Sequence, residues 1–284
     1  MADLSKLFNK TLATRATTAL VFVSIMILGI MISPYTLWLL FGIINVLSLV
    51  EFQKISIALP GNKPNHPGLE TAMVITLGTI IYVIITSVAL NWIDGRYIIL
   101  VMPLLFLLFI YALYSRSESP LSRMSLNLAS LLWISIPTAL SLPIALIDGT
   151  FSPLKLIGII LLVWISDSFA YIVGSVIGKT PLFKRISPKK TWEGSAGGLV
   201  ASLLFAFLLS FIVPEWSFAK WSVIAVLAVF LGTTGDLIES LLKRSVKIKD
   251  SGSILPGHGG FLDRFDAYFF SVPFIYTYLY LFNL

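Results

Sequence analysis

The fold of this chain is decided by apolar stretches such as Leu154-Lys-Leu-Ile-Gly-Ile-Ile-Leu-Leu-Val-Trp-Ile-Ser-Asp-Ser-Phe-Ala-Tyr-Ile-Val-Gly-Ser-Val-Ile177. Only Lys155 and Asp167 are charged in this stretch. A helix of about 20 apolar residues is long enough to cross the hydrocarbon core of a bilayer. We therefore expect a transmembrane helix from Leu154 to Ile177.

Eight further apolar runs, ended by Pro, Gly or charged residues, predict an all-α polytopic integral membrane protein with about nine transmembrane helices. They span residues 17–32, 35–50, 71–90, 97–114, 126–147, 194–213, 221–242 and 265–282. The break at Ser33-Pro34 is the weakest, because it could instead be a kink within one longer helix. A composition of 57% hydrophobic and 12% charged residues, with a mean hydropathy of +0.93, excludes a soluble globular fold.

The basic residues predict which side of the membrane each connection faces. Alternating the connections of nine helices puts 17 of the 20 Lys and Arg residues on one face and only Arg96, Lys155 and Lys220 on the other. Cytoplasmic loops carry such an excess of basic residues. We therefore expect a cytoplasmic N-terminus, an external C-terminus and residence in the cell inner (plasma) membrane. The net charge of +6 then reflects topology, and no nucleic-acid partner is expected.

The chain is expected to form one membrane domain in three segments. Residues 1–16 suggest a cytoplasmic amphipathic segment, although a frayed basic tail is an equal alternative. Residues 17–150 would hold about five helices. Residues 151–284 would hold about four catalytic helices and two cytoplasmic loops, 179–193 and 243–264. The first apolar run is expected to be retained as a helix, because no small-residue cleavage site follows it.

Acidic residues are concentrated between Trp164 and Asp266. Asp167 lies inside an apolar run, where an unpaired carboxylate is costly and is therefore a functional candidate, with helix packing as the alternative. Asp236 and Glu239 lie three residues apart and share one helix face, with Gly232 and Gly235 allowing close approach there. Asp263 and Asp266 have the same spacing at the start of the last run, where they could also be simple helix caps.

Two loops combine basic residues, glycines and carboxylates. They read Ser187-Pro-Lys-Lys-Thr-Trp-Glu-Gly194 and Lys243-Arg-Ser-Val-Lys-Ile-Lys-Asp-Ser-Gly-Ser-Ile-Leu-Pro-Gly-His-Gly-Gly-Phe-Leu-Asp-Arg-Phe-Asp266. Lys, Arg and backbone N–H groups bind phosphate, whereas carboxylates bind hard divalent cations. With no cysteine and two histidines, any metal must be held mainly by oxygen. For the first loop, charge that only sets topology is the alternative.

The second loop resembles the signature of phosphatidate cytidylyltransferases, also called CDP-diacylglycerol synthases. The resemblance covers Ser240 to Asp266 without a departure at the fixed positions, and extends to Trp164–Tyr171, Ser187–Gly194 and Gly235–Ser240. It implies transfer of CMP from CTP to phosphatidic acid, with release of pyrophosphate and a requirement for Mg²⁺. A second adjacent cation and a homodimer are further expectations from the resemblance.

Roles follow for the residues in these blocks. Asp236 and Asp263, with Asp167 as a less certain third, are the expected catalytic metal ligands, and Lys243 and Arg264 are the expected catalytic cations. Phosphates of CTP and phosphatidate would be bound by ten positions of the two loops, of which Lys243 also has the catalytic role: Ser187, Lys189, Lys190, Thr191, Lys243, Arg244, Lys249, His258, Gly259 and Gly260.

Three other functions compete with this interpretation. A transporter could use Asp167 for proton coupling, but its polar residues should then gather at the midplane of two related halves. A lipid kinase that uses CTP would release CDP in place of pyrophosphate. A transferase for a polyprenyl phosphate would keep the chemistry and change the lipid.

Overall fold

The computed structural model describes residues 2–254, 257 and 259–282, with side chains from residue 16 onward. Each predicted apolar run coincides with a helix or with a continuous helical stretch. The elements are α1 (Ala2–Met31), α2 (Pro34–Ala58), α3 (Pro67–Ala89), η1 (Gly95–Leu100), α4 (Val101–Tyr114), α5 (Pro120–Ser130), η2 (Leu131–Ser135), α6 (Ile136–Ala145), α7 (Pro153–Ile177), β1 (Pro181–Phe183), β2 (Ser187–Thr191), α8 (Trp192–Ile212), α9 (Phe218–Ser245) and α10 (Leu262–Phe282).

Seven helical stretches in the described part of the chain are long and apolar enough to cross a membrane, so the chain is an integral membrane protein. They are α2, α3, η1 with α4, α5 with η2 and α6, α7, α8 and α9. The apolar part of α1, Ala16–Met31, is shorter, and α10 begins with a charged turn. Nine crossings and the sides of the two termini stay predictions.

Ser33-Pro34 separates two helices. The Ser33 hydroxyl accepts a hydrogen bond from the Thr36 N–H at 3.1 Å, and the Thr36 hydroxyl oxygen accepts one from the Ser33 N–H at 3.0 Å. This reciprocal capping box satisfies backbone donors that the start of a helix leaves free. Pro34 then occupies the first turn of α2, where its missing N–H costs nothing.

The all-α expectation is confirmed for the membrane segments and needs one correction in the loop 179–193. There β1 and β2 form an antiparallel hairpin, with Pro181 opposite Thr191 and Phe183 opposite Ser187. The hairpin pairs backbone groups that an open loop would leave to water. Its last strand leads directly into α8, whose N-cap is Thr191.

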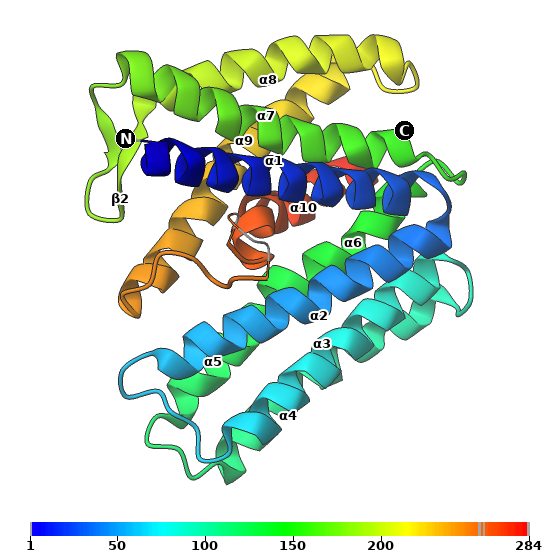
Figure 1. The fold of residues 1–284 in the computed structure, drawn as a ribbon. Helices are drawn as coiled ribbons and strands as arrows, with labels where there is room; N and C mark the ends of the chain where they lie inside the picture. The colour runs from blue at the N-terminus through cyan, green and yellow to red at the C-terminus, as the bar shows by residue number, and fades with distance from the viewer. Residues whose placement is uncertain (1, 255–256, 258, 283–284) are drawn as a thin grey trace.

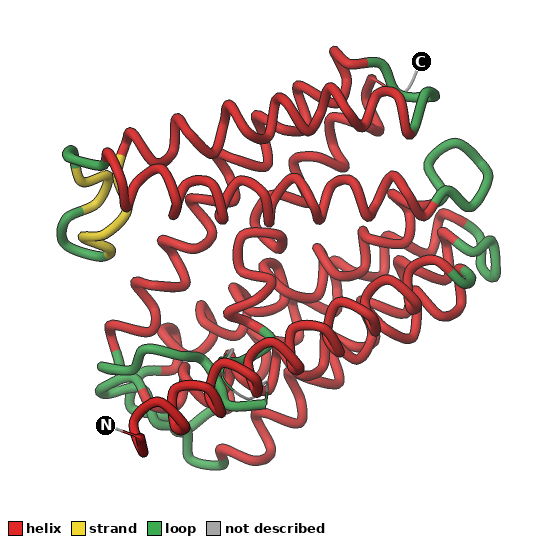
Figure 2. The backbone as a smooth tube through the Cα atoms, turned by 45° about the horizontal axis from the view of Figure 1, so that its top comes forward, coloured by secondary structure: helices red, strands yellow, loops and turns green. Residues whose placement is uncertain are grey.

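The helices form two groups that meet at α10 (Figure 1). In one group α2, α3 and α6 pack together, and in the other α7 packs against α8 and α8 against α9. The helix α10 contacts both α9 and α6, and α1 crosses the molecule in contact with α2 and α7. The connections gather at two opposite ends, and the end with the β1–β2 hairpin also carries the segment between α9 and α10 (Figure 2).

Glycines let the helices around the carboxylates approach closely. A Cβ at Gly198 would lie 2.7 Å from the Ser166 carbonyl oxygen of α7, so α8 packs with its backbone against α7. A Cβ at Gly235 would lie 2.6 Å from the Asp266 carbonyl oxygen, so the same holds for α9 and α10. Small residues are the usual means of close helix contact in membranes. The predicted close approach at Gly235 is thus confirmed.

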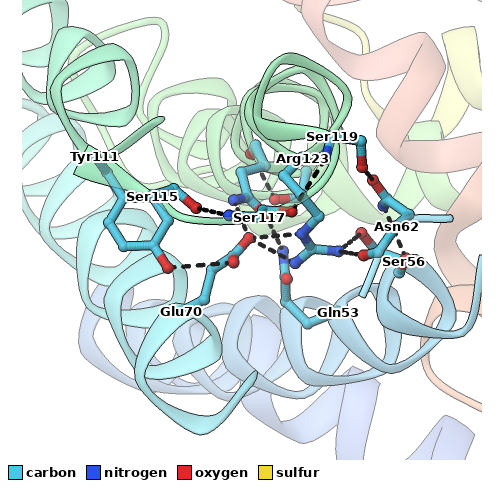
Figure 3. A network of polar contacts seen from close by, with 11 residues as sticks. Gln53, Ser56, Asn62, Glu70, Tyr111, Ser115, Ser117, Ser119 and Arg123 are labelled. Atoms are coloured by element: carbon cyan, nitrogen blue, oxygen red, sulfur yellow. Dashed lines mark hydrogen bonds and ion pairs between the residues drawn. The ribbon is translucent and has the colours of Figure 1, made fainter. Parts of the chain in front are cut away.

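A buried ion pair joins α3 to α5 in the N-terminal group (Figure 3). One Glu70 carboxylate oxygen accepts hydrogen bonds from Arg123 Nη2 at 2.5 Å and from Asn127 at 2.6 Å. Arg123 also donates to the Ser56 hydroxyl of α2 at 3.0 Å. The sequence had placed Arg123 in a cytoplasmic loop, but it is buried in a helix because Glu70 compensates its charge.

Candidate active site

Three carboxylates from α9 and α10 form the centre of the site. Asp236, Glu239 and Asp266 each offer one oxygen atom, and these atoms lie within 4.8 Å of one another. Asp236 and Glu239 face the same side because they are three residues apart on α9. The close approach at Gly235 brings Asp266 of α10 to that side.

The cluster fits a hard divalent cation. Glu239 is fully buried, and its Oε1 atom has no hydrogen-bond partner within the described residues. A buried carboxylate oxygen without a partner costs free energy that a bound cation would offset. All three donors are oxygens, which Mg²⁺ prefers, and the Asp236 side chain is 31% exposed, which leaves an approach.

Two lysines bind the edges of this cluster. The Lys243 ammonium lies 2.6 Å from Glu239 Oε2 and 2.6 Å from Asp263 Oδ1, so it joins α9 to the start of α10. The Lys190 ammonium at the end of β2 lies 2.5 Å from Asp236 Oδ2. These two contacts link both predicted loops to the carboxylates.

Asp263 is held by protein donors and lies outside the three-carboxylate cluster. Its Oδ2 atom accepts hydrogen bonds from the N–H groups of Ser251 and Gly260, each at 2.8 Å. Burial raises the pKa of Asp263, but these hydrogen bonds and the Lys243 charge outweigh it and lower the pKa below its ordinary value. Asp263 therefore stays ionised and orders the loop ahead of α10.

Asp167 lines a cavity of about 310 Å³ that also reaches Asp266 of the cluster. The cavity is lined by residues of α1, α7 and α10, including Asp263, Arg264 and Asp266. Asp167 interacts electrostatically with Lys190 and Asp236, so it belongs to the same charged region. The structure thus brings Asp167 and Arg264 together at the cavity, although Asp167 is not one of the three clustered ligands.

The other predicted phosphate-binding residues divide into two groups. Ser187, Lys189 and Thr191 lie on β2, where Lys189 is exposed and Thr191 accepts a hydrogen bond from the Gly194 N–H at 3.1 Å. Arg244 is exposed in the last turn of α9 and Lys249 in the segment after it, and Arg244 donates to the Ile248 carbonyl at 2.9 Å.

The glycines of the second loop have separate roles. Gly259 adopts a φ of +82°, a left-handed conformation that favours glycine. Gly260 is buried, and its N–H donates to Asp263. His258 lies outside the described residues.

Sequence reasoning missed Glu51 of α2. Its carboxylate is buried and accepts hydrogen bonds from the N–H groups of Phe261 (3.1 Å) and Leu262 (2.9 Å) and from the Ser251 hydroxyl (2.9 Å). A Cβ at Gly260 would overlap the Glu51 carboxylate, so any other residue there would displace Glu51 from its hydrogen bonds. The available signal was an acidic residue directly after the apolar run 35–50. Glu239 and Asp266 were noted in the sequence but not included among the predicted metal ligands.

Comparisons with known proteins identify the family of the chain. A model described as the cytidylyltransferase family matches residues 13–282. The chain is 48% identical to phosphatidate cytidylyltransferase of Bacillus subtilis over 123 residues, which is 43% of this chain and 45% of that protein. For the Haemophilus influenzae phosphatidate cytidylyltransferase the identity is 40% over 134 residues, or 45% of this chain and 46% of the relative.

A plant relative shows the same partial coverage. The chain is 47% identical to the chloroplastic phosphatidate cytidylyltransferase 5 of Arabidopsis thaliana over 116 residues, 40% of this chain and 29% of that protein. The matched segments thus span less than half the length of each of these relatives. The family match, in contrast, runs from α1 to α10, and it includes every described carboxylate of the site. The chain therefore belongs to the cytidylyltransferase family.

Proposed function

We propose that this protein transfers the cytidylyl group of CTP to phosphatidic acid, giving CDP-diacylglycerol and pyrophosphate. The observation that carries the proposal is the Asp236, Glu239 and Asp266 cluster beside a cavity that also contains Arg264. Clustered carboxylates with adjacent cations suit phosphoryl and nucleotidyl transfer. The names of the relatives support CTP and phosphatidic acid as the substrates.

The bond changes in this reaction are balanced without a further reactant. An oxygen of the lipid phosphate forms a bond to the α-phosphorus of CTP, and the bond between that phosphorus and the bridging oxygen of the β-phosphate breaks. Pyrophosphate leaves with the electron pair of that bond. A phosphate monoester is already an anionic nucleophile at neutral pH, so the chain does not need to supply a general base.

The basic residues would hold the phosphates in line for this attack. Lys190 and Lys243 each already contact a carboxylate of the site, so they are fixed where the phosphates would meet the cluster. Arg264 lines the cavity and would bind the lipid phosphate. Lys189, exposed on β2, would bind the outer phosphates of CTP.

Asp236, Glu239 and Asp266 would hold Mg²⁺, with Asp167 within electrostatic reach. When bound, this ion would neutralise negative charge on phosphate oxygens, including charge that develops on the leaving group. Without a cation, three carboxylates this close together repel one another.

We also propose that the site faces the cytoplasm, where CTP is available. The β1–β2 hairpin and the segment between α9 and α10 lie at one end of the molecule, and these connections carry most of the basic residues of the C-terminal half (Figure 2). This charge distribution supports the cytoplasmic side of an inner membrane.

The experiment is a turnover assay of the purified, detergent-solubilised protein with phosphatidic acid, CTP and added or chelated Mg²⁺. The proposal requires pyrophosphate and CDP-diacylglycerol in equal amounts, only with Mg²⁺. Release of CDP would indicate a lipid kinase. Activity with a polyprenyl phosphate alone would change the proposed lipid substrate. If the folded protein formed no product, the proposal of cytidylyl transfer would be overturned.

A further inference from the structure

Two hollows of opposite character meet along α1. The first is the cavity described above, whose floor carries Asp167, Asp263 and Asp266. The second is a groove of about 460 Å³ between α1 and α2. Thr18 and Phe22 line both hollows, so the two hollows adjoin at these residues.

The groove is apolar beyond the two threonines at its entrance. Its further lining residues are Val21, Ile25, Met26, Leu40, Ile43, Ile44 and Phe261. Met26 and Ile44 are buried and form its floor, whereas Ile25 and Ile43 are 53% and 48% exposed and form its rims. In a membrane protein those exposed rims face lipid, so the groove is open toward the bilayer along its length.

Phe22 marks the boundary between the polar and the apolar hollow. Its ring lies 6.2 Å from the ring of Trp164, 6.4 Å from that of Phe261 and 6.1 Å from that of Phe265. Trp164 precedes Asp167 by three residues, and Phe261 and Phe265 flank Asp263. The aromatic contacts therefore fix the groove entrance relative to the charged site.

We propose that the α1–α2 groove binds an acyl chain of the lipid whose phosphate enters the charged cavity. The occupant follows from this adjacency, because a phosphate at Arg264 leaves its attached chains near Phe22, which also lines the apolar groove. From Thr18 to Ile25 the helix rises by about 10 Å, enough for much of an acyl chain. The inference rests on the proposed function, since it concerns the lipid substrate of that site.

Another apolar groove provides the comparison. It lies between α8 and α9, measures about 350 Å³ and is lined by residues such as Leu199, Val229 and Phe230. It shares no lining residue with the charged cavity. Any bilayer lipid could occupy this groove, so it controls for unspecific lipid contact.

The first test does not depend on turnover. A phosphatidate with a photoactivatable diazirine in one acyl chain is incorporated into phosphatidylcholine vesicles with the protein, and adducts are mapped by mass spectrometry. We expect adducts on the α1–α2 groove that unlabelled phosphatidate displaces, and Ile25→Trp should remove most of them. Adducts of equal yield on the α8–α9 groove, or adducts that unlabelled phosphatidate does not displace, would overturn the proposal.

The second test measures the KM for phosphatidates of different chain length. Ile25→Trp should raise the KM for the dioleoyl lipid about 10-fold, which corresponds to the loss of about two buried methylene groups. The KM for CTP, and that for dihexanoyl phosphatidate, should change little. Leu199→Trp is the matched control and should leave all three values near those of the unmodified protein.

The outcomes separate this inference from the proposed function. Displaceable groove adducts without any nucleotidyl transfer would support the groove and contradict the reaction. Normal transfer would support the reaction. If the KM for dioleoyl phosphatidate, relative to that for dihexanoyl phosphatidate, were then the same in Ile25→Trp and Leu199→Trp, the role of the groove would be contradicted.

Discussion

The two carboxylate oxygens of Glu239 differ in their polar contacts. Oε2 lies 2.6 Å from the Lys243 ammonium, whereas Oε1 is buried without a hydrogen-bond partner in the described part of the chain. Glu239→Gln keeps the size of the side chain and removes its charge, and Lys243 keeps Asp263 as a partner. We expect the Mg²⁺ concentration for half-maximal activity to rise about 10- to 100-fold.

This prediction is checked by titrating turnover with Mg²⁺ at saturating CTP. Glu215→Gln is the matched control, because Glu215 is exposed in the connection between α8 and α9, away from the cluster. An unchanged Mg²⁺ dependence in Glu239→Gln would remove Glu239 from the cation site.

Asp263 combines a role in the loop with its place at the cavity. Asn at this position loses the charge that pairs with Lys243, and its amide nitrogen cannot accept a hydrogen bond from the Ser251 or Gly260 N–H. We expect Asp263→Asn to lose turnover and also about 1–3 kcal/mol of unfolding free energy. The measurement is thermal unfolding in detergent beside the turnover assay.

The control for this substitution is Asp250→Asn, since Asp250 is exposed in the same loop. A melting temperature that does not change in Asp263→Asn, with turnover lost, would mean that Asp263 acts in the reaction without ordering the loop. That result would favour its sequence-based assignment as a metal ligand.

At the scale of the elements, α2 supports the start of α10 through Glu51. Its carboxylate accepts hydrogen bonds from the N–H groups of Phe261 and Leu262, which the first turn of a helix leaves without partners. The Ser251 hydroxyl donates to the same carboxylate, so the loop before α10 is fixed at two points. A negative charge at a helix N-terminus also stabilises the helix dipole.

Glu51→Ala should therefore loosen the loop without unfolding the helices. Because opening the loop would cost about 1 kcal/mol less for each lost hydrogen bond, trypsin cleavage after the exposed Lys249 should accelerate at least about 10-fold. Gly260→Ala should have the same effect, since its methyl group would overlap Glu51. Lys54→Ala is the control on the same helix, and cleavage equal to that control would contradict the role of Glu51.

At the scale of the whole molecule, the basic residues predict how the chain lies in the membrane. The natural sequence has no cysteine, so a single introduced thiol reports its own side. Lys184→Cys, beside the β1–β2 hairpin, should react with an impermeant maleimide only from the cytoplasmic side. Arg96→Cys, at the opposite end, should react only from the outside. Labelling of both from one side would contradict the predicted alternation of the connections.

The apolar runs were predictable as helices because a segment that crosses a bilayer needs only sufficient length and apolar side chains, and a helix pairs its own backbone groups. The sequence left the break at Ser33 open between two helices and a kink, and the capping box in the structure decides for two helices. The β1–β2 hairpin was missed because its residues have weak strand patterns and are stabilised by pairing with each other.

The candidate site was predictable only in outline. The two polar loops indicated carboxylates and cations, and both lysine contacts join residues that the sequence had singled out. Which carboxylates cluster could not be derived, because the sequence allowed close approach at Gly235 without indicating that α10, with Asp266, packs there. Asp263 accepts hydrogen bonds from the N–H groups of Ser251 and Gly260, and its role as a metal ligand stays a prediction.

The sequence by itself determined the membrane class, the positions of the helices and the chemistry of the two polar loops, because these depend on local composition and spacing. Only the tertiary structure decided that Glu51 supports a loop 200 residues away from it, as its bond to Ser251 shows. It also decided that α1 borders both the charged cavity and the apolar groove. Contacts of this kind arise from how helices pack, and packing is a property of pairs of distant segments that no single segment encodes.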